Sequence, residues 1–260
     1  MRDTSQRRTR ILALLREQGS VQVTPLANQY SVSTQTIRQD LKFLAKLGMV
    51  TRSYGGAVMH APAEAVPEAE IHLKRRLFSL EKSGIGRAAA ALILAGDSII
   101  LDSGTTTLQI AVHIPDDIEA RIVTNDLAIA NELAHHKNVQ LTMLGGSLRR
   151  KTMSMYGTQA ETAMHSLSVD KVFLGVDGFD LERGITTHFE PEAILNRLMC
   201  AAAAQVIVVT DSSKFGRVCL HRILDPARVN TLVTDERIEP KLADQLAGLG
   251  VKVIRATPDR

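Results

Sequence analysis

The sequence predicts an α/β protein in two parts, and two patterns carry this prediction. Over residues 1–58, apolar residues recur with the period of an α-helix in three short segments. Beyond residue 97, short aliphatic runs alternate with helical segments, which is typical of a largely parallel sheet with helices on its faces. We therefore expect a small domain at residues 1–58, a linker at residues 59–75 and an α/β domain at residues 76–260.

Three helices are expected in the small domain. The first has its apolar side at residues 11–15 and ends at Gly19. A short second helix covers Val23 to Tyr30. The third begins after Ser33, a favourable N-cap residue, and ends at Gly48. The tight connection between the second and third helices is typical of a helix-turn-helix, in which the later helix enters the major groove of DNA.

The third helix has two faces. Ile37, Leu41 and Leu44 form one narrow apolar stripe that must be buried, and Leu47 extends it. The opposite face carries long hydrogen-bond donors that can reach base edges or phosphates: Gln35, Arg38, Gln39, Lys42 and Lys46.

Residues 49–58 predict a two-stranded hairpin with Gly55 and Gly56 at its turn, which completes a winged helix-turn-helix. Arg52 and Tyr54 of this wing are expected to contact the DNA backbone or the minor groove. The alternative is a small protein-interaction domain with a solvated basic face. The predicted DNA-binding residues are Ser33, Thr34, Gln35, Thr36, Arg38, Gln39, Lys42, Arg52 and Tyr54.

Charge is unevenly distributed along the chain and favours the DNA-binding interpretation. Residues 1–60 hold nine Lys or Arg and three Asp or Glu, a balance of +6, while the whole chain carries +3. The remaining 200 residues therefore sum to −3. A basic module joined to a mildly acidic body is expected where one domain meets phosphates and the other does not.

Composition narrows the classes of protein further. No segment resembles a signal peptide or a membrane-spanning helix, so we expect a cytoplasmic protein. The two cysteines, Cys200 and Cys219, form neither a disulfide framework nor a metal-binding spacing, and we expect reduced thiols. The eight histidines show no ligand pattern either, so no metal and no cofactor are expected.

The linker is indicated by residues 59–71, which are rich in Ala, Pro and Glu and contain Pro62 and Pro67. A helical pattern follows at residues 76–95. The strand candidates after it are residues 98–102, 120–124, 139–144, 170–176, 205–210, 229–233 and 251–255, with helices such as 126–135 and 190–204 between them.

The first strand leads into a polar loop that can hold a phosphate. Asp102, Ser103, Gly104, Thr105, Thr106 and Thr107 combine hydroxyls, a glycine that permits close approach of a ligand, and the start of a helix with unpaired N–H groups. The loop lacks the Lys of a nucleotide P-loop and the three glycines of a dinucleotide site. The alternative for this loop, taken alone, is an ordinary capped turn.

Further polar loops follow the other strands, and the carboxyl ends of parallel strands meet at one edge of a sheet. We expect one cleft formed by Asn125, by Gly145 and Gly146, by Asp177, and by Lys214. Hydroxyls and cations suit a phosphate, while Asn and Asp suit sugar hydroxyls. For the run Arg149, Arg150 and Lys151, a solvated charge cluster is the favoured interpretation.

Several segments in both halves resemble the DeoR family of bacterial transcriptional regulators, and the resemblance covers nearly the whole chain. Those in the first half are Ser33-x-x-Thr36-Ile37-Arg38-x-Asp40-Leu41 and Arg52-x-Tyr54-Gly55-Gly56-Ala57. Those in the second half are residues 101–107, Thr124-Asn125, Gly145-Gly146, 174–177, Thr187-His188, Glu192-Ala193 and 210–215. Residues 19–23 and 181–184 are most similar to the regulators of amino-sugar catabolism within the family.

The resemblance implies a repressor whose C-terminal domain is similar to sugar-phosphate isomerases and binds a phosphorylated sugar, such as an amino-sugar or ketohexose phosphate. The phosphate loop of the family falls on residues 103–107, its sugar-facing positions on Asn125, Asp177, His188 and Glu192, and a further ligand contact on Lys214. Gln39 stands where the family commonly has Arg, and Tyr54 where it often has His. The operator sequence therefore does not carry over.

The implied function is a homodimer or homotetramer that binds double-stranded operator DNA and is released by the sugar phosphate. Activation in place of repression stays open. The competing interpretation is an isomerase-like enzyme with a DNA-binding head, because Asp177-Gly178-Phe179-Asp180 resembles the paired-aspartate turn of pentose-phosphate isomerases. We expect a sensor and not an enzyme, because a similar fold does not establish chemistry.

Overall fold

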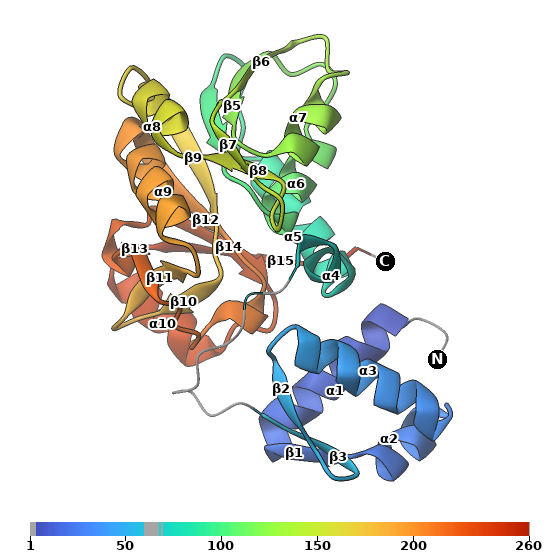
Figure 1. Cartoon of the computed structure of the whole chain (residues 1–260). Helices are drawn as coiled ribbons and strands as arrows, with labels where there is room; N and C mark the ends of the chain where they lie inside the picture. Colours follow the sequence, from blue (N-terminus) through green and yellow to red (C-terminus); the bar gives the residue numbers. More distant parts are fainter. Residues whose placement is uncertain (1–3, 60–67, 69, 260) are drawn as a thin grey trace. The chain divides into compact units, whose positions relative to one another are not determined.

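A computed structural model describes residues 4–59, 68 and 70–259 (Figure 1). The chain forms two compact units, Met1–Ser79 and Leu80–Arg260. No helix among the described residues is long and apolar enough to cross a membrane.

The first unit contains the three predicted helices and the predicted hairpin. The elements in chain order are α1 (Thr4–Gln18), β1 (Ser20–Gln22), α2 (Val23–Tyr30), α3 (Thr34–Lys46), β2 (Val50–Ser53), β3 (Gly56–Met59) and α4 (Ile71–Arg76). The wing has a third strand that the sequence pattern did not reveal, because β1 pairs antiparallel with β3 in a sheet of order β1-β3-β2. At three residues, β1 is too short to show a period.

The core of the first unit extends beyond the predicted boundary. Leu77 and Phe78 are each 1% exposed and pack with the apolar residues of α1, α2 and α3. The predicted linker at residues 59–75 therefore ends in a helix, α4, that belongs to the first unit. Pro62 and Pro67 lie outside the described residues.

The prediction of one helix over residues 76–95 is wrong. Helix α4 ends at Arg76, and α5 (Ser79–Ala90) begins after an interruption at Leu77 and Phe78. Phe78 has a left-handed φ of 56°, which no residue inside a right-handed helix adopts. The buried side chains of Leu77 and Phe78 gave the segment an apolar period. They pack in the core of the first unit, however, whereas the buried residues of α5 pack against the sheet of the second unit.

The second unit is built on a seven-stranded parallel sheet of order β15-β14-β12-β9-β4-β5-β6. All seven predicted strands are present, each within two residues of its expected bounds: β4 (Ser98–Leu101), β5 (Ala120–Thr124), β6 (Val139–Met143), β9 (Val169–Gly175), β12 (Ala203–Val209), β14 (Thr231–Asp235) and β15 (Lys252–Ala256).

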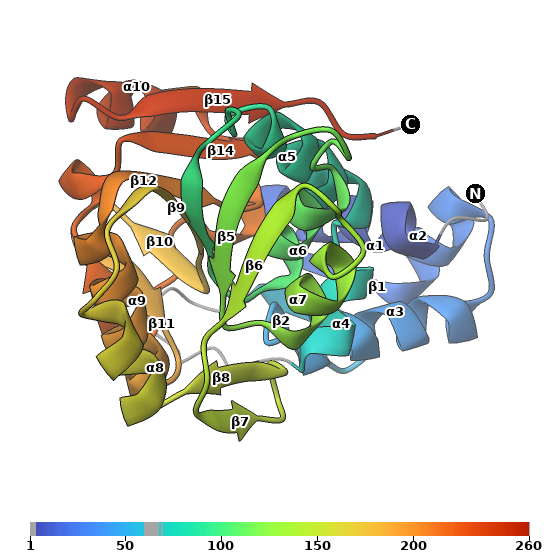
Figure 2. The same ribbon diagram turned by 90° about the horizontal axis from the view of Figure 1, so that it is seen from above.

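Helices cover both faces of this sheet, as Figures 1 and 2 show. Successive strand residues alternate between two cores: Val172 and Leu174 face one, and Phe173 between them faces the other. The first core is closed by α8 (Thr158–Met164), α9 (Glu190–Ala202) and α10 (Pro240–Gly248), the second by α5, α6 (Thr105–Val112) and α7 (Leu127–Leu133).

Two small sheets were not predicted. One has the order β10-β11-β13 and is formed by β10 (Gly178–Asp180), β11 (Gly184–Thr187) and β13 (His221–Leu224). The other is an antiparallel hairpin of β7 (Ser147–Arg149) and β8 (Ser154–Tyr156). Their three- and four-residue strands lie among the loops that follow the strands of the main sheet, where the sequence indicates polar loops.

The strand order reverses between β4 and β9. From β4 the chain proceeds through β5 and β6 to one edge, and it then returns to β9 and proceeds through β12 and β14 to β15 at the other edge. In open parallel sheets, ligands bind outside the carboxyl ends of the strands at such a switch point. The loops after β4, β5 and β9 therefore border the position where a site is expected.

Candidate functional site

Helix α3 presents the predicted DNA-contacting side chains on the surface of the first unit. Its first turn is capped by Ser33, whose Oγ accepts the backbone N–H of Thr36 at 3.1 Å. Ile37, Leu41 and Leu44 are at most 1% exposed, so the predicted burial of the apolar stripe is confirmed. The donors on the opposite face, namely Gln35, Arg38, Gln39, Lys42 and Lys46, are all exposed.

The wing and α3 form one concave surface. A hollow of about 310 Å³ between them is lined by Arg38 and Leu41 from the helix and by Arg52 and Tyr54 from the wing. Tyr54 is fully exposed, at 105%. Two guanidinium groups and an exposed aromatic ring suit contacts with the phosphates and groove of duplex DNA.

Asp40, the one acid of α3, does not face this surface. It is 1% exposed and accepts hydrogen bonds from Arg7 Nε at 2.6 Å and Arg8 Nε at 2.8 Å. Arg8 also stacks over the ring of Phe43, 3.8 Å from its centroid. Two of the nine basic residues counted in the sequence therefore neutralise a buried carboxylate.

In the second unit, the loop after β4 forms a turn that opens α6. Gly104 has a φ of 147°, and its N–H donates to Asp126 Oδ2 at 3.2 Å. Helix α6 has no side-chain cap, so its first N–H groups are not used by a capping side chain. The hydroxyl of Thr107 donates to the carbonyl of Gly104 at 3.0 Å, so Thr107 stabilises the turn itself. Ser103 and Thr106 are nine-tenths buried or more.

Asn125, in the segment after β5, is bonded to the β7–β8 hairpin. Its amide nitrogen donates to the carbonyl of Met155 at 3.0 Å, and its backbone carbonyl accepts the N–H of Met155 at 2.7 Å. The side-chain oxygen of Asn125 is buried without a hydrogen-bond partner. A buried acceptor of this kind is satisfied when a ligand donates a hydrogen bond to it.

Asp102 is buried at the carboxyl end of β4, where it accepts the N–H of Gly175 at 3.2 Å. The amide nitrogen of Asn196 donates to its other oxygen at 3.2 Å when the amide is oriented to satisfy both of its atoms. Burial, and then the negative charge of Glu192, raise the pKa of Asp102 well above its ordinary value. The sequence indicated Asp102 but not Asn196, which is buried in the middle of α9.

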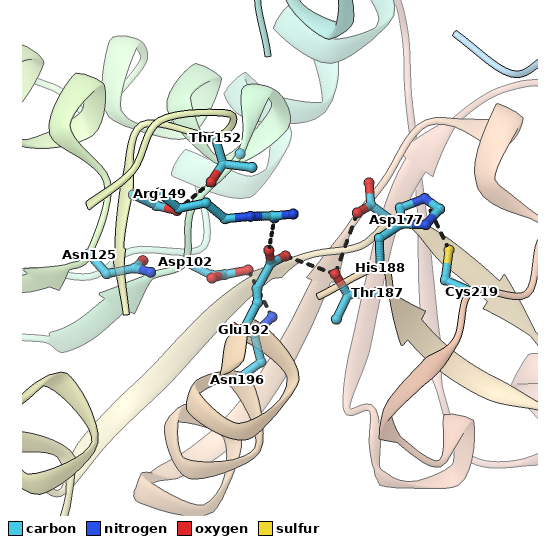
Figure 3. A network of polar contacts seen from close by, with 12 residues as sticks. Asp102, Asn125, Arg149, Thr152, Asp177, Thr187, His188, Glu192, Asn196 and Cys219 are labelled. Carbon is cyan, nitrogen blue, oxygen red and sulfur yellow. Dashed lines mark hydrogen bonds and ion pairs between the residues drawn. The ribbon is translucent and has the colours of Figure 1, made fainter. Parts of the chain in front are cut away.

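A chain of polar contacts links the β7–β8 hairpin to the loop after β12 (Figure 3). Arg149 Nη1 donates to Glu192 Oε2 at 2.9 Å. Thr187 Oγ1 lies 3.0 Å from Glu192 Oε1 and 3.4 Å from Asp177 Oδ2. Lys214 Nζ lies 3.8 Å from Asp177 Oδ1. The predicted residues Glu192, Asp177 and Lys214 are thus brought together.

The prediction of a solvated charge run is wrong for Arg149. Its side chain is 13% exposed and stacks on Phe189, with Cζ 4.1 Å from the ring centroid. Arg150 and Lys151 are exposed, as that prediction expected. No periodic signal distinguishes the three, because the short hairpin determines which of them turns inward.

His188 and Cys219 lie at one end of this network, with Nε2 and Sγ 3.5 Å apart. Cys219 lies in the segment between β12 and β13 and is 9% exposed. Burial, and then the charge of Asp177, raise the pKa of its thiol to about 11. The thiol is therefore a weak nucleophile at neutral pH. Gly145 and Gly146 lead from β6 into the hairpin.

A second buried charge pair was missed. Lys82 of α5 is 5% exposed and lies 3.9 Å from Asp211, which follows β12. Burial raises the pKa of Asp211, but the charges of Lys82 and Lys214 together with hydrogen bonds from Ser213 leave that pKa below its ordinary value. A lone lysine in a helical pattern normally faces solvent, so no sequence signal marked Lys82. Within the described parts of the chain, no three His, Cys, Asp or Glu side chains are arranged to hold a metal ion.

Both units match models of known protein families. Residues 7–62 match the DeoR-like helix-turn-helix domain, and residues 78–236 match the DeoR C terminal sensor domain. The chain is 47% identical over 254 residues to a protein of Escherichia coli O157:H7 named for repression of the aga operon, covering 96% of this chain and 93% of the relative.

A more distant relative and a solved structure are also similar. The HTH-type transcriptional repressor GlcR of Bacillus subtilis is 30% identical over 249 residues, covering 96% of this chain and 95% of GlcR. Ribose 5-phosphate isomerase A from Methanocaldococcus jannaschii has a TM-score of 0.39 and 15% identity, covering 53% of this chain and 54% of that one. The matches at the level of sequence cover both units in the same order, and the relatives are named as regulators. The chain belongs to the DeoR family of transcriptional regulators.

Proposed function

We propose that this protein represses a sugar or amino-sugar catabolic operon and is released from its operator by a phosphorylated sugar. The observation that carries the effector part is the group of polar residues at the β4–β9 switch point, which we infer line an effector cleft. It combines the uncapped start of α6, the unsatisfied side-chain oxygen of Asn125 and the polar network that ends at Lys214. Such groups suit a phosphate together with sugar hydroxyls.

The proposed DNA-binding residues are those of α3 and the wing: Ser33, Thr34, Gln35, Thr36, Arg38, Gln39, Lys42, Arg52 and Tyr54. The proposed effector-binding residues are Asp102, Ser103, Gly104, Thr105, Thr106, Thr107, Asn125, Gly145, Gly146, Asp177, His188, Glu192 and Lys214. The resemblance of residues 19–23 and 181–184 to regulators of amino-sugar catabolism supports an amino-sugar phosphate as one candidate effector.

The protein acts as a symmetric homodimer or homotetramer, so that paired recognition helices meet half-sites about one helical turn apart or a multiple of it. For the sugar phosphate to induce transcription, it must bind the arrangement that is incompetent for DNA more tightly than the competent one. The usual scale of such coupling is ~1–3 kcal/mol.

The first experiment titrates the purified protein with phosphorylated amino sugars, ketohexoses and pentoses while following thermal unfolding. A ligand at 100 times its dissociation constant adds about 2.7 kcal/mol of stability. The compound that stabilises the protein should also weaken operator binding in a gel-shift assay and be recovered unchanged. Conversion of that compound would support an isomerase, and unchanged operator affinity with every compound would refute induction.

Two substitutions separate the two functions. Arg38→Ala should weaken operator binding by about 5- to 150-fold and leave effector binding unchanged. Thr106→Ala should leave operator binding unchanged and raise the effector concentration needed for release. Arg255→Ala, at an exposed position on β15, is the matched control and should change neither.

A further inference from the structure

We propose that the β7–β8 hairpin is a lid on the effector cleft and that the Arg149–Glu192 ion pair is its latch in the ligand-free protein. On binding, an anionic group of the effector replaces Glu192 as the partner of Arg149. This inference rests on the proposed function, because it assigns a moving part to the same cleft.

The hairpin is attached to one side of the switch point. It belongs to no larger sheet, and an isolated two-stranded hairpin is marginally stable at best. Its β8 strand is held by the segment after β5: Met155 N–H donates to the carbonyl of Asn125 at 2.7 Å, and Leu127 N–H donates to the carbonyl of Met153 at 3.1 Å. This root lies beside the loop that opens α6, since Asp126 also accepts the N–H of Gly104.

Glycines flank the hairpin at both ends. Gly145 and Gly146 precede β7, and Gly157 follows β8. The φ angles of Gly146 and Gly157 are 122° and 97°, which side chains rarely allow. Chain positions of this kind absorb the backbone rotation when a lid moves. The side chains of Leu148 and Met153 are 40% and 38% exposed, whereas Thr152 and Ser154 are 8% and 4% exposed, so the hairpin is packed on one face only.

Two side chains of the hairpin, those of Arg149 and Tyr156, reach the start of α9, on the other side of the switch point. Arg149 pairs with Glu192 at 2.9 Å and stacks on Phe189. Tyr156 meets the same ring edge-on, with centroids 5.1 Å apart. Figure 3 shows the side chain of Arg149 extending toward Glu192, with Asp102 and Asn125 nearby. An ion pair and two ring contacts therefore tie the hairpin to the start of α9.

The guanidinium group of Arg149 can exchange one anionic partner for another. The planar fork of an arginine fits a carboxylate and a phosphate equally well, so a phosphate can replace Glu192 without moving Arg149 away. Glu192 would keep the hydrogen bond from Thr187 at 3.0 Å after the exchange.

The test is hydrogen exchange of the amides at residues 147–156 in the full chain, with inorganic phosphate as the probe. Glu192→Gln should speed exchange of the hairpin at least about fivefold, because opening no longer breaks an ion pair. Arg149→Gln should do the same. Saturating phosphate should restore slow exchange in Glu192→Gln, where Arg149 is present, and not in Arg149→Gln.

The control removes a different ion pair. Asp225→Asn breaks the Arg222–Asp225 pair, whose side chains are 53% exposed, and should leave exchange of the hairpin unchanged. Unchanged exchange at β9 and β12 shows that each variant is folded. Wild-type hairpin exchange in both glutamine variants, or equal protection of both by phosphate, would overturn the proposal. Hydrogen exchange of the wild type and the two glutamine variants without ligand tests the latch even if no sugar phosphate affects operator binding. Failure of the lid and failure of the proposed function are therefore distinguishable.

Discussion

Asp40 lies within the predicted DNA-contacting helix, yet its carboxylate faces the interior of the first unit. Two guanidinium groups, from Arg7 and Arg8, contact it at 2.6 and 2.8 Å, and all three side chains are at most 10% exposed. Removing one partner of such a cluster leaves buried charge without compensation. The cluster therefore fixes α3 against α1, and it acts on DNA binding only through the position of α3.

Asp40→Asn should lower the free energy of unfolding by ~3–5 kcal/mol, because two buried cations lose their counter-ion. Urea unfolding of the purified protein measures this change. Asp225→Asn removes one partner of an ion pair on the surface and should cost about 1 kcal/mol or less. Equal losses in the two variants would contradict the assigned role of Asp40.

Asp102 provides a prediction of pH dependence. Its raised pKa means that the folded protein keeps a proton which the unfolded chain has already released. The wild type therefore loses stability as pH rises from the ordinary carboxyl pKa toward the raised one. Asp102→Asn cannot ionise, so the stability of the variant relative to the wild type should increase between about pH 4 and neutrality.

Urea unfolding of both proteins at several pH values measures this difference. Asp244→Asn, at an exposed position on α10, is the control and should show no comparable increase. If the stability difference between Asp102→Asn and the wild type is the same at every pH, the carboxyl group of Asp102 titrates alike in the folded and unfolded wild-type chain.

At the scale of elements, the wing depends on one glycine. A Cβ at Gly56 would lie 2.0 Å from the carbonyl oxygen of Val21 in β1. This oxygen belongs to the backbone, so it cannot rotate away as the end of a side chain could. Gly56→Ala should therefore displace β3 from β1 and move Arg52 and Tyr54, weakening operator binding at least about tenfold, since 1.4 kcal/mol is a factor of ten. Effector binding by the second unit should not change.

The gel-shift assay measures this loss, with Gly248→Ala as the matched control. A Cβ at Gly248 would meet no atom within 4 Å, and the residue ends a helix of the second unit. Operator affinity equal to that of the wild type in Gly56→Ala would mean that the wing does not contact DNA.

The elements that could be predicted from the sequence are those long enough to show a period. Helices α2, α3 and α9 were identified because burial of one face gives their apolar residues a regular spacing. The seven strands of the main sheet were identified because burial on both faces makes a strand a continuous apolar run. Strands β1, β7, β8 and β10 have three residues each, so no period is visible. The inward turn of Arg149 depends on such a strand and could not be predicted.

At the scale of the molecule, the two-part organisation and the positions of the polar loops followed from the sequence, because strand ends of a parallel sheet meet at one edge. The pairing of Lys82 with Asp211, of Arg149 with Glu192 and of Arg7 and Arg8 with Asp40 did not. Each pair joins side chains more than 30 positions apart, and only the folded chain brings them within reach. The candidate site was predicted in its location and not in its internal contacts.

The proposed function also has a consequence for the whole molecule that no single residue reveals. If the effector lowers operator affinity by some factor, bound operator must lower effector affinity by the same factor, because both are one coupling free energy. A coupling of ~1–3 kcal/mol corresponds to about 5- to 150-fold.

We therefore expect equal factors when effector affinity is measured with and without saturating operator duplex, and operator affinity with and without saturating effector. Arg38→Ala is the control: a duplex concentration that saturates the wild type, but not this more weakly binding variant, should change the effector affinity of the variant less. Unequal factors in the wild type would mean that the two measurements do not connect the same protein species, so that release would include a change of oligomeric state.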